Sequence, residues 1–328
     1  MNNEWMEFYR GKRVLVTGGT GSIGSKLVEQ LLERGAEVHV LSRGENKQQE
    51  LYRQVYRKFN HYPDLKLRIG DVRNRQTVIE AVQDIEIVFH TAAMKHVDLC
   101  ESNVWEAVQT NIIGAQNLRE ACLEWDVEVV VVVSTDKAAD PAGVMGETKH
   151  LAERLFLGSD MHGVRTVVTR FGNVLGSTGS VVWKFKEMIE RGERLTITDP
   201  KMLRFVMTPK QATELVLWAG VSAGDKSIVT REMSSVSVET LVNTISNGKM
   251  YDWIIIGSRP GEKREEVLFS DIELARTTVR NVEIGTVASI DLNVQAIPIQ
   301  DLSAFDIHTK CIGEEKLHGM LIEAGVLV

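Results

Sequence analysis

Short apolar runs alternate with amphipathic segments from the amino terminus to about residue 170. The apolar runs are rich in β-branched residues and include RVLVT, EVHVL, EIVFH, EVVVVV and RTVVT. Between them lie segments with apolar residues at helical spacing, among them residues 25–33, 104–123 and 141–156. Strands and helices that alternate in this way form βαβ units. The pattern therefore predicts an α/β fold, a doubly wound parallel sheet with helices on both faces, in residues 1–172.

The pattern changes after Asn173. A glycine-rich loop, GNVLGSTGS, precedes a helix predicted over residues 182–190 and a short strand in RLTITD. The remainder mixes short helices and strands, as is typical of a smaller lobe and not of a second independent core. We therefore expect a C-terminal substrate-binding lobe, mainly residues 173–328, with a segment near residues 205–230 returning to the first domain.

Composition and charge narrow the class of partner. The 328 residues carry a formal net charge of −7, which gives no electrostatic reason to expect nucleic acid or anionic lipid as the main partner. Cys100, Cys122 and Cys311 have neither CxxC nor metal-ligand spacing, so we predict no metal site and no disulfide framework. The amino terminus lacks the apolar core of a signal peptide, and no apolar run approaches the ~20 residues of a membrane span. We expect a soluble, cytoplasmic protein.

A glycine-rich segment directly follows the first predicted strand. In VTGGTGSIG, glycines stand at positions 18, 21 and 24, and a predicted helix follows. Glycines permit a tight turn and let backbone N–H groups approach a pyrophosphate, which the N-terminus of the helix also favours. A tight turn without a ligand is the alternative. The segment predicts a Rossmann dinucleotide-binding loop, with cofactor contacts from Gly18, Thr20, Gly21, Ser22, Ile23 and Gly24.

The end of the second predicted strand bears on the choice between NAD and NADP. A carboxylate there binds the ribose 2′-hydroxyl of NAD, whereas an arginine accommodates the 2′-phosphate of NADP. The chain offers Ser42, Arg43 and, one helical turn onward, Lys47, although Glu45 lies close by. We therefore predict NADP, with NAD as the alternative cofactor and a solvated loop charge as the alternative interpretation of Arg43.

Residues after the third and fourth predicted strands complete the expected cofactor site. Asp71 and Val72 follow the third strand, and Ala92 follows the fourth. Asp71 is placed to meet the adenine amino group, with a plain helix cap as the alternative.

Polar residues emerge at the carboxyl end of the buried run EVVVVV. Ser134, Thr135, Asp136 and Lys137 lie there, where ligands bind in open α/β sheets. Because side chains alternate along a strand, Ser134 should point away from Thr135. Burial and mutual interaction can hold an adjacent acid and base in complementary protonation states, as acid–base catalysis requires. A surface ion pair in a loop is the alternative.

Eight motifs occur in a fixed order: TGGTGSIG, SRGENKQQE, AAMKHVDLCE, TNIIGAQNL, STDKA followed by MGETK, TRFGNVLGSTGSV, TDPKMLRFVMT and RPGEK. Together they resemble the extended short-chain dehydrogenase/reductase superfamily. More narrowly, they resemble its UDP-N-acetylglucosamine 4,6-dehydratases of bacterial polysaccharide and glycan pathways. The likeness covers residues 11 to about 270, beyond which we see no family signature.

The resemblance implies an internal redox reaction on a UDP-N-acetylhexosamine. Nicotinamide removes a hydride from C4, water is lost across C5 and C6, and the hydride returns at C6 to leave a 4-keto-6-deoxy sugar. By matching positions, Asp136 would protonate the leaving C6 hydroxyl and Lys137 would take the C5 proton. Lys149 would hydrogen-bond the nicotinamide ribose. The resemblance also implies a homo-oligomer, with the helices at residues 104–123 and 149–156 as candidate interfaces.

Met145 departs from the tyrosine-bearing members of this family. It stands one helical turn before Lys149, and its thioether cannot act as a general base near neutral pH. Oxidation at C4 must then rely on Thr135, Asp136, a water or the arrangement of the substrate itself. Similar members that carry methionine there are active, so the resemblance still implies an enzyme, and it favours retention at C5.

Matching positions also imply a substrate site. Its candidate residues are Lys95, Asn173, Ser180, Arg204, Arg259 and Glu262. Arginine suits the nucleotide diphosphate because its guanidinium presents a fixed fork to phosphate oxygens, and a salt bridge is the alternative role.

Two rival functions stay open. One is a UDP-sugar 4-epimerase, which shares the C4 oxidation but needs no acid–base pair at C5 and C6, so that Asp136 and Lys137 speak against it. The other is a non-catalytic regulatory protein that binds NADP and a UDP-sugar, for which Met145 is the only support.

Overall fold

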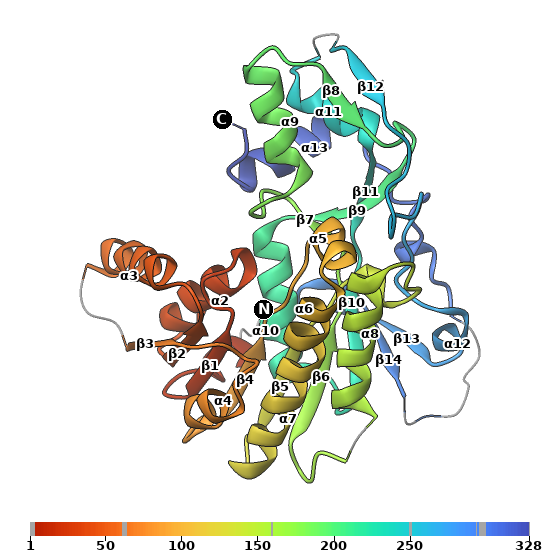
Figure 1. The fold of residues 1–328 in the computed structure, drawn as a ribbon. Helices are drawn as coiled ribbons and strands as arrows, with labels where there is room; N and C mark the ends of the chain where they lie inside the picture. The colour runs from red at the N-terminus through yellow and green to blue at the C-terminus, as the bar shows by residue number, and fades with distance from the viewer. Residues whose placement is uncertain are drawn as a thin grey trace.

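A nine-stranded sheet forms the body of the molecule in the computed structural model, which describes residues 4–60, 64–158, 160–248, 251–292, 294 and 300–327 (Figure 1). Among these residues the strand order is β13–β14–β10–β6–β5–β4–β1–β2–β3. The strands are β1 (Arg13–Thr17), β2 (Glu37–Ser42), β3 (Leu65–Ile69), β4 (Ile87–His90), β5 (Val129–Val133), β6 (Arg165–Thr169), β10 (Ser227–Arg231), β13 (Thr277–Val282) and β14 (Gly285–Asp291). From β3 to β10 all neighbours are parallel, and β14 and β13 extend the sheet as antiparallel strands.

Helices cover both faces of this sheet, which buries its β-branched runs almost completely. On one face α2 (Ser22–Glu33) contacts α10 (Pro209–Ser222); on the other, α7 (Gly114–Glu124) contacts both α4 (Arg75–Val82) and α8 (Val144–Leu157). The helix α3 (Glu45–Phe59) packs on the edge strand β3. The predicted doubly wound α/β fold is therefore confirmed.

Two helix predictions needed correction. The segment predicted as one helix over residues 104–123 consists of α6 (Val104–Ala107), a π-helical turn (Val108–Ile113) and α7, and it is preceded by α5 (Val97–Ser102). The π-helical turn presents Asn111, whose amide bonds both backbone groups of Met94. The helix predicted over residues 141–156 begins only at Val144, because Gly143 is extended and Glu101 accepts a hydrogen bond of 2.7 Å from the Val144 N–H group.

A smaller lobe lies beyond the carboxyl-terminal edge of the main sheet (Figure 1). In the described part of the chain it contains a sheet of β7 (Asn173–Val174), β9 (Leu203–Met207) and β11 (Ser234–Ser237), and a pair of β8 (Leu195–Ile197) and β12 (Trp253–Ile255). The helices α9 (Val181–Glu190), α11 (Val238–Ile245) and α13 (Glu314–Glu323) pack around an apolar core of their own. The helix and strand predicted at residues 182–190 and RLTITD correspond to α9 and β8.

The chain beyond residue 173 contributes to both parts. β10, β13 and β14 lie in the main sheet, and α12 (Asp271–Leu274) leads into the β13–β14 hairpin. The amino-terminal helix α1 (Glu4–Glu7) is followed by Tyr9, whose ring is fully buried and whose hydroxyl donates to the Leu217 carbonyl of α10. No helix within the described ranges is long and apolar enough to cross a bilayer.

Candidate active site

The glycine-rich loop runs from β1 into α2 with its backbone tightly packed. Gly18 has φ +70°, and a Cβ there would lie 2.7 Å from the Ala92 N atom. A Cβ on Gly24 would lie 2.7 Å from the Cα of Gly19, so the helix can approach the loop this closely only without a side chain. Thr20, Gly21, Ser22 and Ile23 form the turn and the first residues of α2, whose free N–H groups favour an anion.

A cluster of charges lies beyond the end of β2. Asp71 accepts hydrogen bonds from the backbone and the guanidinium of Arg73, and an Arg43 nitrogen lies 3.8 Å from its carboxylate. Burial raises the pKa of Asp71, but the bonds and charge of Arg73 outweigh it and hold this pKa below its usual value. Asn74, not Asp71, caps α4. The alternative interpretation of Asp71 as a helix cap was therefore wrong.

The remaining residues predicted on the cofactor side differ in exposure. Arg43 is exposed and Lys47 lies in the first turn of α3. The Ser42 hydroxyl is buried and accepts a hydrogen bond of 2.9 Å from Gln48. Val72 is buried against α7, the helix that begins at Gly114. A Cβ added to Gly114 would lie 2.7 Å from a Val72 methyl carbon.

Three consecutive residues at the end of β5 form a hydrogen-bonded group. Asp136 is completely buried, and its Oδ1 accepts bonds of 2.9 Å from both the Thr135 hydroxyl and Lys137 Nζ. Its Oδ2 has no hydrogen-bond partner among the described residues. Burial lowers the pKa of Lys137, but the charges of Asp136 and Glu266 outweigh it and hold this pKa above its usual value. Thr135, Asp136 and Lys137 are thus joined by hydrogen bonds at the carboxyl edge of the sheet.

The helix α8 brings Met145 and Lys149 to the same region. Met145 is buried and lines a small pocket together with Lys137. The amino group of Lys149 donates a bond of 2.6 Å to the Val133 carbonyl, and burial lowers its pKa to about 8 against the opposing charge of Glu153. The Ser134 side chain points away from Thr135, as predicted, and its hydroxyl donates to the Glu153 carboxylate.

Arg170 connects α8 to the C-terminal part of the chain. It is 1% exposed, and its guanidinium bonds both carboxylate oxygens of Glu153 and of Glu273, together with the Leu268 carbonyl. All five N–H donors are therefore used. The buried guanidinium of Arg170 therefore fixes α8, the helix that carries Lys149, to α12.

The loop of residues 175–180 lies across the glycine-rich loop. The Thr178 N–H donates a bond of 2.9 Å to the Ser22 hydroxyl, and the Thr178 carbonyl accepts one of 2.9 Å from Lys95. Burial, and to a lesser extent the charge of Lys47, lowers the pKa of Lys95. Ser180 precedes α9, and its buried hydroxyl has no partner in the portion of the chain that is described. Thr178 thus connects Lys95, which was predicted to bind the substrate, with Ser22, which was predicted to bind the cofactor.

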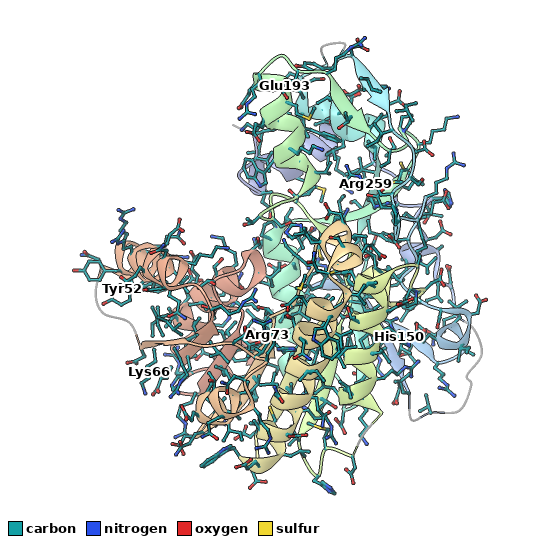
Figure 2. The ribbon with its side chains drawn as sticks, in the orientation of Figure 1. Tyr52, Lys66, Arg73, His150, Glu193 and Arg259 are labelled. Atoms are coloured by element: carbon teal, nitrogen blue, oxygen red, sulfur yellow. The ribbon has the colours of Figure 1, made fainter. Side chains whose placement is uncertain are left out.

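The segment with the RPGEK motif closes the site from the small lobe. Arg204 donates to the carbonyls of Lys263 and Arg264, at 2.8 and 3.2 Å, so much of its guanidinium is engaged with this segment. The Glu262 carboxylate accepts a bond from the Arg259 N–H within the same turn. Arg259 lies on the small-lobe side of the molecule, away from His150 on α8 (Figure 2). Asn173 Oδ1 lies 3.5 Å from Lys137 Nζ, which brings a predicted substrate residue to the acid–base pair.

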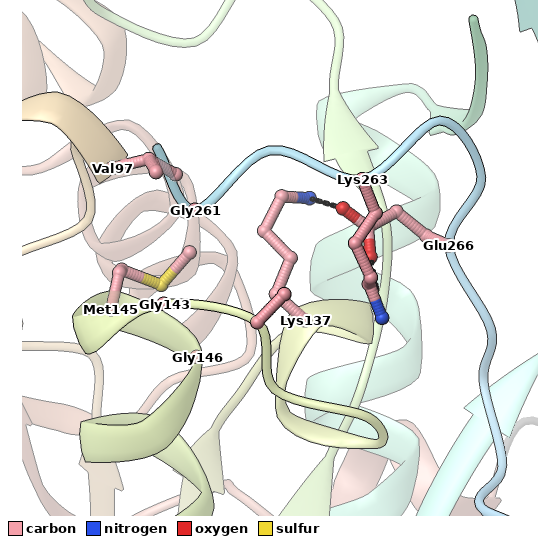
Figure 3. A pocket seen from close by; sticks show the side chains of 9 residues that line it. Val97, Lys137, Gly143, Met145, Gly146, Gly261, Lys263 and Glu266 are labelled. Atoms are coloured by element: carbon pink, nitrogen blue, oxygen red, sulfur yellow. Dashed lines mark ion pairs between the residues drawn. The ribbon is translucent and has the colours of Figure 1, made fainter. Parts of the chain in front are cut away.

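Two glycines explain how closely this segment approaches α8. A Cβ on Gly143 would lie 2.7 Å from the Gly261 Cα, and Gly261 itself has φ +77°. The approach brings Lys263 and Glu266 beside Lys137 (Figure 3). Both residues were missed from the sequence. Lys263 lies inside a quoted motif, whereas Glu266 ends a run of charges that is typical of a solvated surface.

Comparisons with known proteins agree with this fold and loop. The chain matches the model of a family described as polysaccharide biosynthesis protein over residues 14–286. A Methanocaldococcus jannaschii protein named uncharacterized membrane protein MJ1061 is 41% identical over 281 residues, which cover 81% of this chain and 83% of that protein. A UDP-glucose 4-epimerase of Rickettsia canadensis is 37% identical over 276 residues, covering 81% and 80% respectively.

Solved structures agree as well. Pen from Bacillus thuringiensis has 31% identity and a TM-score of 0.88, covering 98% of this chain and 100% of that one. The Thermus thermophilus UDP-glucose 4-epimerase in complex with NAD has 26% identity and a TM-score of 0.68, covering 78% and 90%. The fold and the glycine-rich loop define an extended short-chain dehydrogenase/reductase of the kind that modifies nucleotide sugars. Within that class, the chain belongs to the polysaccharide biosynthesis protein family.

Proposed function

We propose that the chain is a UDP-N-acetylglucosamine 4,6-dehydratase that forms a UDP-4-keto-6-deoxy sugar with retention at C5. The observation that carries the proposal is the adjacent pair of Asp136 and Lys137, held 2.9 Å apart at the carboxyl end of β5. Elimination of water across C5 and C6 needs a base for one proton and an acid for the leaving hydroxyl. Epimerisation at C4 shares the oxidation of C4 but needs no acid–base pair at C5 and C6.

The residues around the glycine-rich loop fit a dinucleotide. The missing side chains at Gly18 and Gly24 leave room for a close approach of loop and helix, and Arg43 and Lys47 supply positive charge beyond β2. These features support NADP, with NAD as the alternative. When bound, the nicotinamide would remove a hydride from C4 of the sugar and return it at C6.

Thr135 and Asp136 offer a route for the C4 proton that does not need a tyrosine. The C4 hydroxyl would give its proton to Thr135 while the Thr135 proton passes along the 2.9 Å hydrogen bond to Asp136. Asp136 would then give that proton to the C6 hydroxyl, which leaves as water when the C6–O bond breaks. Met145 takes no part in this route except to exclude water.

Lys137 would hold the second proton. Because the pKa of Lys137 is raised, its own proton must first leave to solvent. The neutral amine then takes the proton from C5, and the electron pair of the broken C–H bond forms the C5–C6 double bond. After hydride has been added at C6, Lys137 returns the proton to C5 from the same side, which gives retention. Lys149, buried with its pKa lowered to about 8, would bind the nicotinamide ribose with N–H groups that the Val133 carbonyl does not use.

A UDP-glucose 4-epimerase is the second candidate, because relatives with that name are 37% identical over most of the chain. A regulatory protein without catalysis is supported only by Met145. Incubation with UDP-N-acetylglucosamine and NADP⁺ in deuterated water, followed by mass spectrometry and proton NMR, separates the three. We expect loss of one water, deuterium at C5 and a methyl group at C6. An unchanged mass with inverted C4 would favour the epimerase, and binding without conversion would favour the regulatory protein.

Arg43→Ala should weaken binding of NADP⁺ roughly ten- to a hundredfold and leave binding of NAD⁺ almost unchanged. The reason is that hydrogen bonds to a charged group contribute about 1.5–3 kcal/mol each, and NAD⁺ lacks the 2′-phosphate. Calorimetric titration with each cofactor measures the effect. Arg57→Ala, at an exposed position near the far end of α3, is the matched control. Equal weakening for both cofactors would contradict the assignment of Arg43 to the 2′-phosphate.

A further inference from the structure

A second buried carboxylate, that of Glu266, faces Lys137 from the small lobe. Glu266 is 1% exposed, and its Oε1 lies 3.5 Å from Lys137 Nζ (Figure 3). Its Oε2 lies 3.4 Å from Lys263 Nζ and makes no hydrogen bond to any described residue. Lys137 therefore lies between two carboxylates, Asp136 from the turn after β5 and Glu266 from a segment more than a hundred residues later.

The surrounding contacts hold Glu266 in this position. Arg204 fixes the carbonyls of Lys263 and Arg264, and Gly261 packs against Gly143. A buried carboxylate lowers stability unless a cation or hydrogen bonds compensate for its lost hydration. Lys263 supplies one such cation, which it also shares with Asp140 at the surface, and Lys137 supplies the other.

We propose that Glu266 is a positioning residue, which holds the Lys137 amine toward C5 and stabilises its ammonium form when the C5 proton arrives. The inference rests on the proposed function. In that mechanism Asp136 carries a proton before elimination, and a neutral carboxyl group holds an amine less firmly than a carboxylate does. While Asp136 carries this proton, Glu266 is, among the described residues, the one ionised carboxylate that still contacts Lys137.

The charge on Lys137 leads to the same conclusion. When Lys137 takes the C5 proton it becomes an ammonium group in a buried site, where charge is costly without a nearby opposite charge. Glu266 supplies that charge at 3.5 Å without itself gaining or losing a proton. Its effect should be confined to the proton transfer at C5, because the route from the C4 hydroxyl runs through Thr135 and Asp136.

Glu266→Gln separates these two steps. The full-length protein with NADP⁺ and UDP-N-acetylglucosamine in deuterated water is followed by the absorbance of reduced nicotinamide and by deuterium at C5. We expect C4 oxidation at a rate close to that of the unmodified protein, and C5 exchange slowed roughly ten- to a hundredfold, less than complete loss of a general base produces. Reduced nicotinamide should therefore accumulate in the variant.

Glu265→Gln is the matched control, because Glu265 is the preceding residue and pairs with His308 at the surface. It should leave both steps unchanged. Should Glu266→Gln fail to fold, as judged by circular dichroism and cofactor binding, Glu266→Asp is used, and the shorter side chain should give the same separation of steps.

The outcomes distinguish the inference from the proposed function. If the unmodified protein removes no water, the proposed function fails and the positioning role fails with it. If the unmodified protein is a dehydratase but Glu266→Gln exchanges C5 at the normal rate, or slows C4 and C5 equally, the dehydratase stands and the positioning role is overturned. A purely structural role for Glu266 predicts the equal slowing.

Discussion

Asp136→Asn should reduce turnover of UDP-N-acetylglucosamine by roughly a hundred- to ten-thousandfold, the range over which general acid–base catalysis contributes. The substitution keeps the size of the side chain but removes the carboxyl group that, in the proposed mechanism, accepts a proton from Thr135 and gives it to the C6 hydroxyl. Steady-state product formation by mass spectrometry measures the loss. Binding of UDP-N-acetylglucosamine should change little, because the nucleotide contacts predicted for Arg204 and Arg259 do not involve Asp136.

Two comparisons make this prediction specific. Asp160→Asn, at an exposed carboxylate after α8, should retain full turnover. Thr135→Val should also lose most of its activity, whereas Thr135→Ser keeps the hydroxyl and should retain it. If Asp136→Asn kept normal turnover, the dehydratase assignment would be contradicted. If Asp136→Asn lost turnover but Thr135→Val kept it, a group other than Thr135 would accept the C4 proton.

Arg170→Met should lower the free energy of unfolding by about 3–5 kcal/mol, as expected when one partner of a buried ion pair is removed. The substitution leaves two buried carboxylates, Glu153 and Glu273, without their shared cation. Urea denaturation of the variant and the unmodified protein measures the difference. Arg154→Met, at an exposed position on the same helix, should change the midpoint little. Equal effects of the two substitutions would contradict a stabilising role for the buried network.

The same network has a defined dependence on pH. Burial raises the pKa of Glu273, but the hydrogen bonds and charge of Arg170 outweigh it and hold this pKa below its usual value. A depressed pKa contributes stability that is complete above the ordinary glutamate pKa of about 4.3 and is lost as the pH falls below it. The difference between Arg170→Met and the unmodified protein should therefore shrink in acid.

Much of the main sheet could be predicted from the sequence because both faces of each central strand are buried. Runs such as VVVVV at β5 can hardly occupy another environment. The start of α8 could not be predicted, because the carboxylate that accepts a hydrogen bond from the Val144 N–H belongs to Glu101, on a different helix. The hairpin of β13 and β14 was also missed. The hairpin ends the sheet, with β13 as its edge strand, and both strands mix buried with partly or fully exposed positions without a long apolar run.

The candidate site was predictable where its residues are adjacent in the sequence. Asp136 and Lys137 are neighbours in sequence, and the glycines of the phosphate loop follow β1 directly. Glu266 and Arg170 could not be recognised, because their partners lie on segments that only the folded chain brings together. Isolated charged residues look alike in a sequence whether they end up in solvent or in the interior.

The contact of Thr178 with Ser22 and Lys95 affects how ligands are selected. The Ser22 hydroxyl and the Lys95 amine already donate to the Thr178 hydroxyl and carbonyl, so a phosphate or sugar oxygen that reaches either donor replaces a bond and does not add one. Such an exchange yields little net affinity, since an ordinary intramolecular hydrogen bond contributes only about 0.5–1.5 kcal/mol. In the proposed function, discrimination among nucleotides then comes from groups that Thr178 cannot imitate, above all the negative charge of a 2′-phosphate at Arg43 and Lys47.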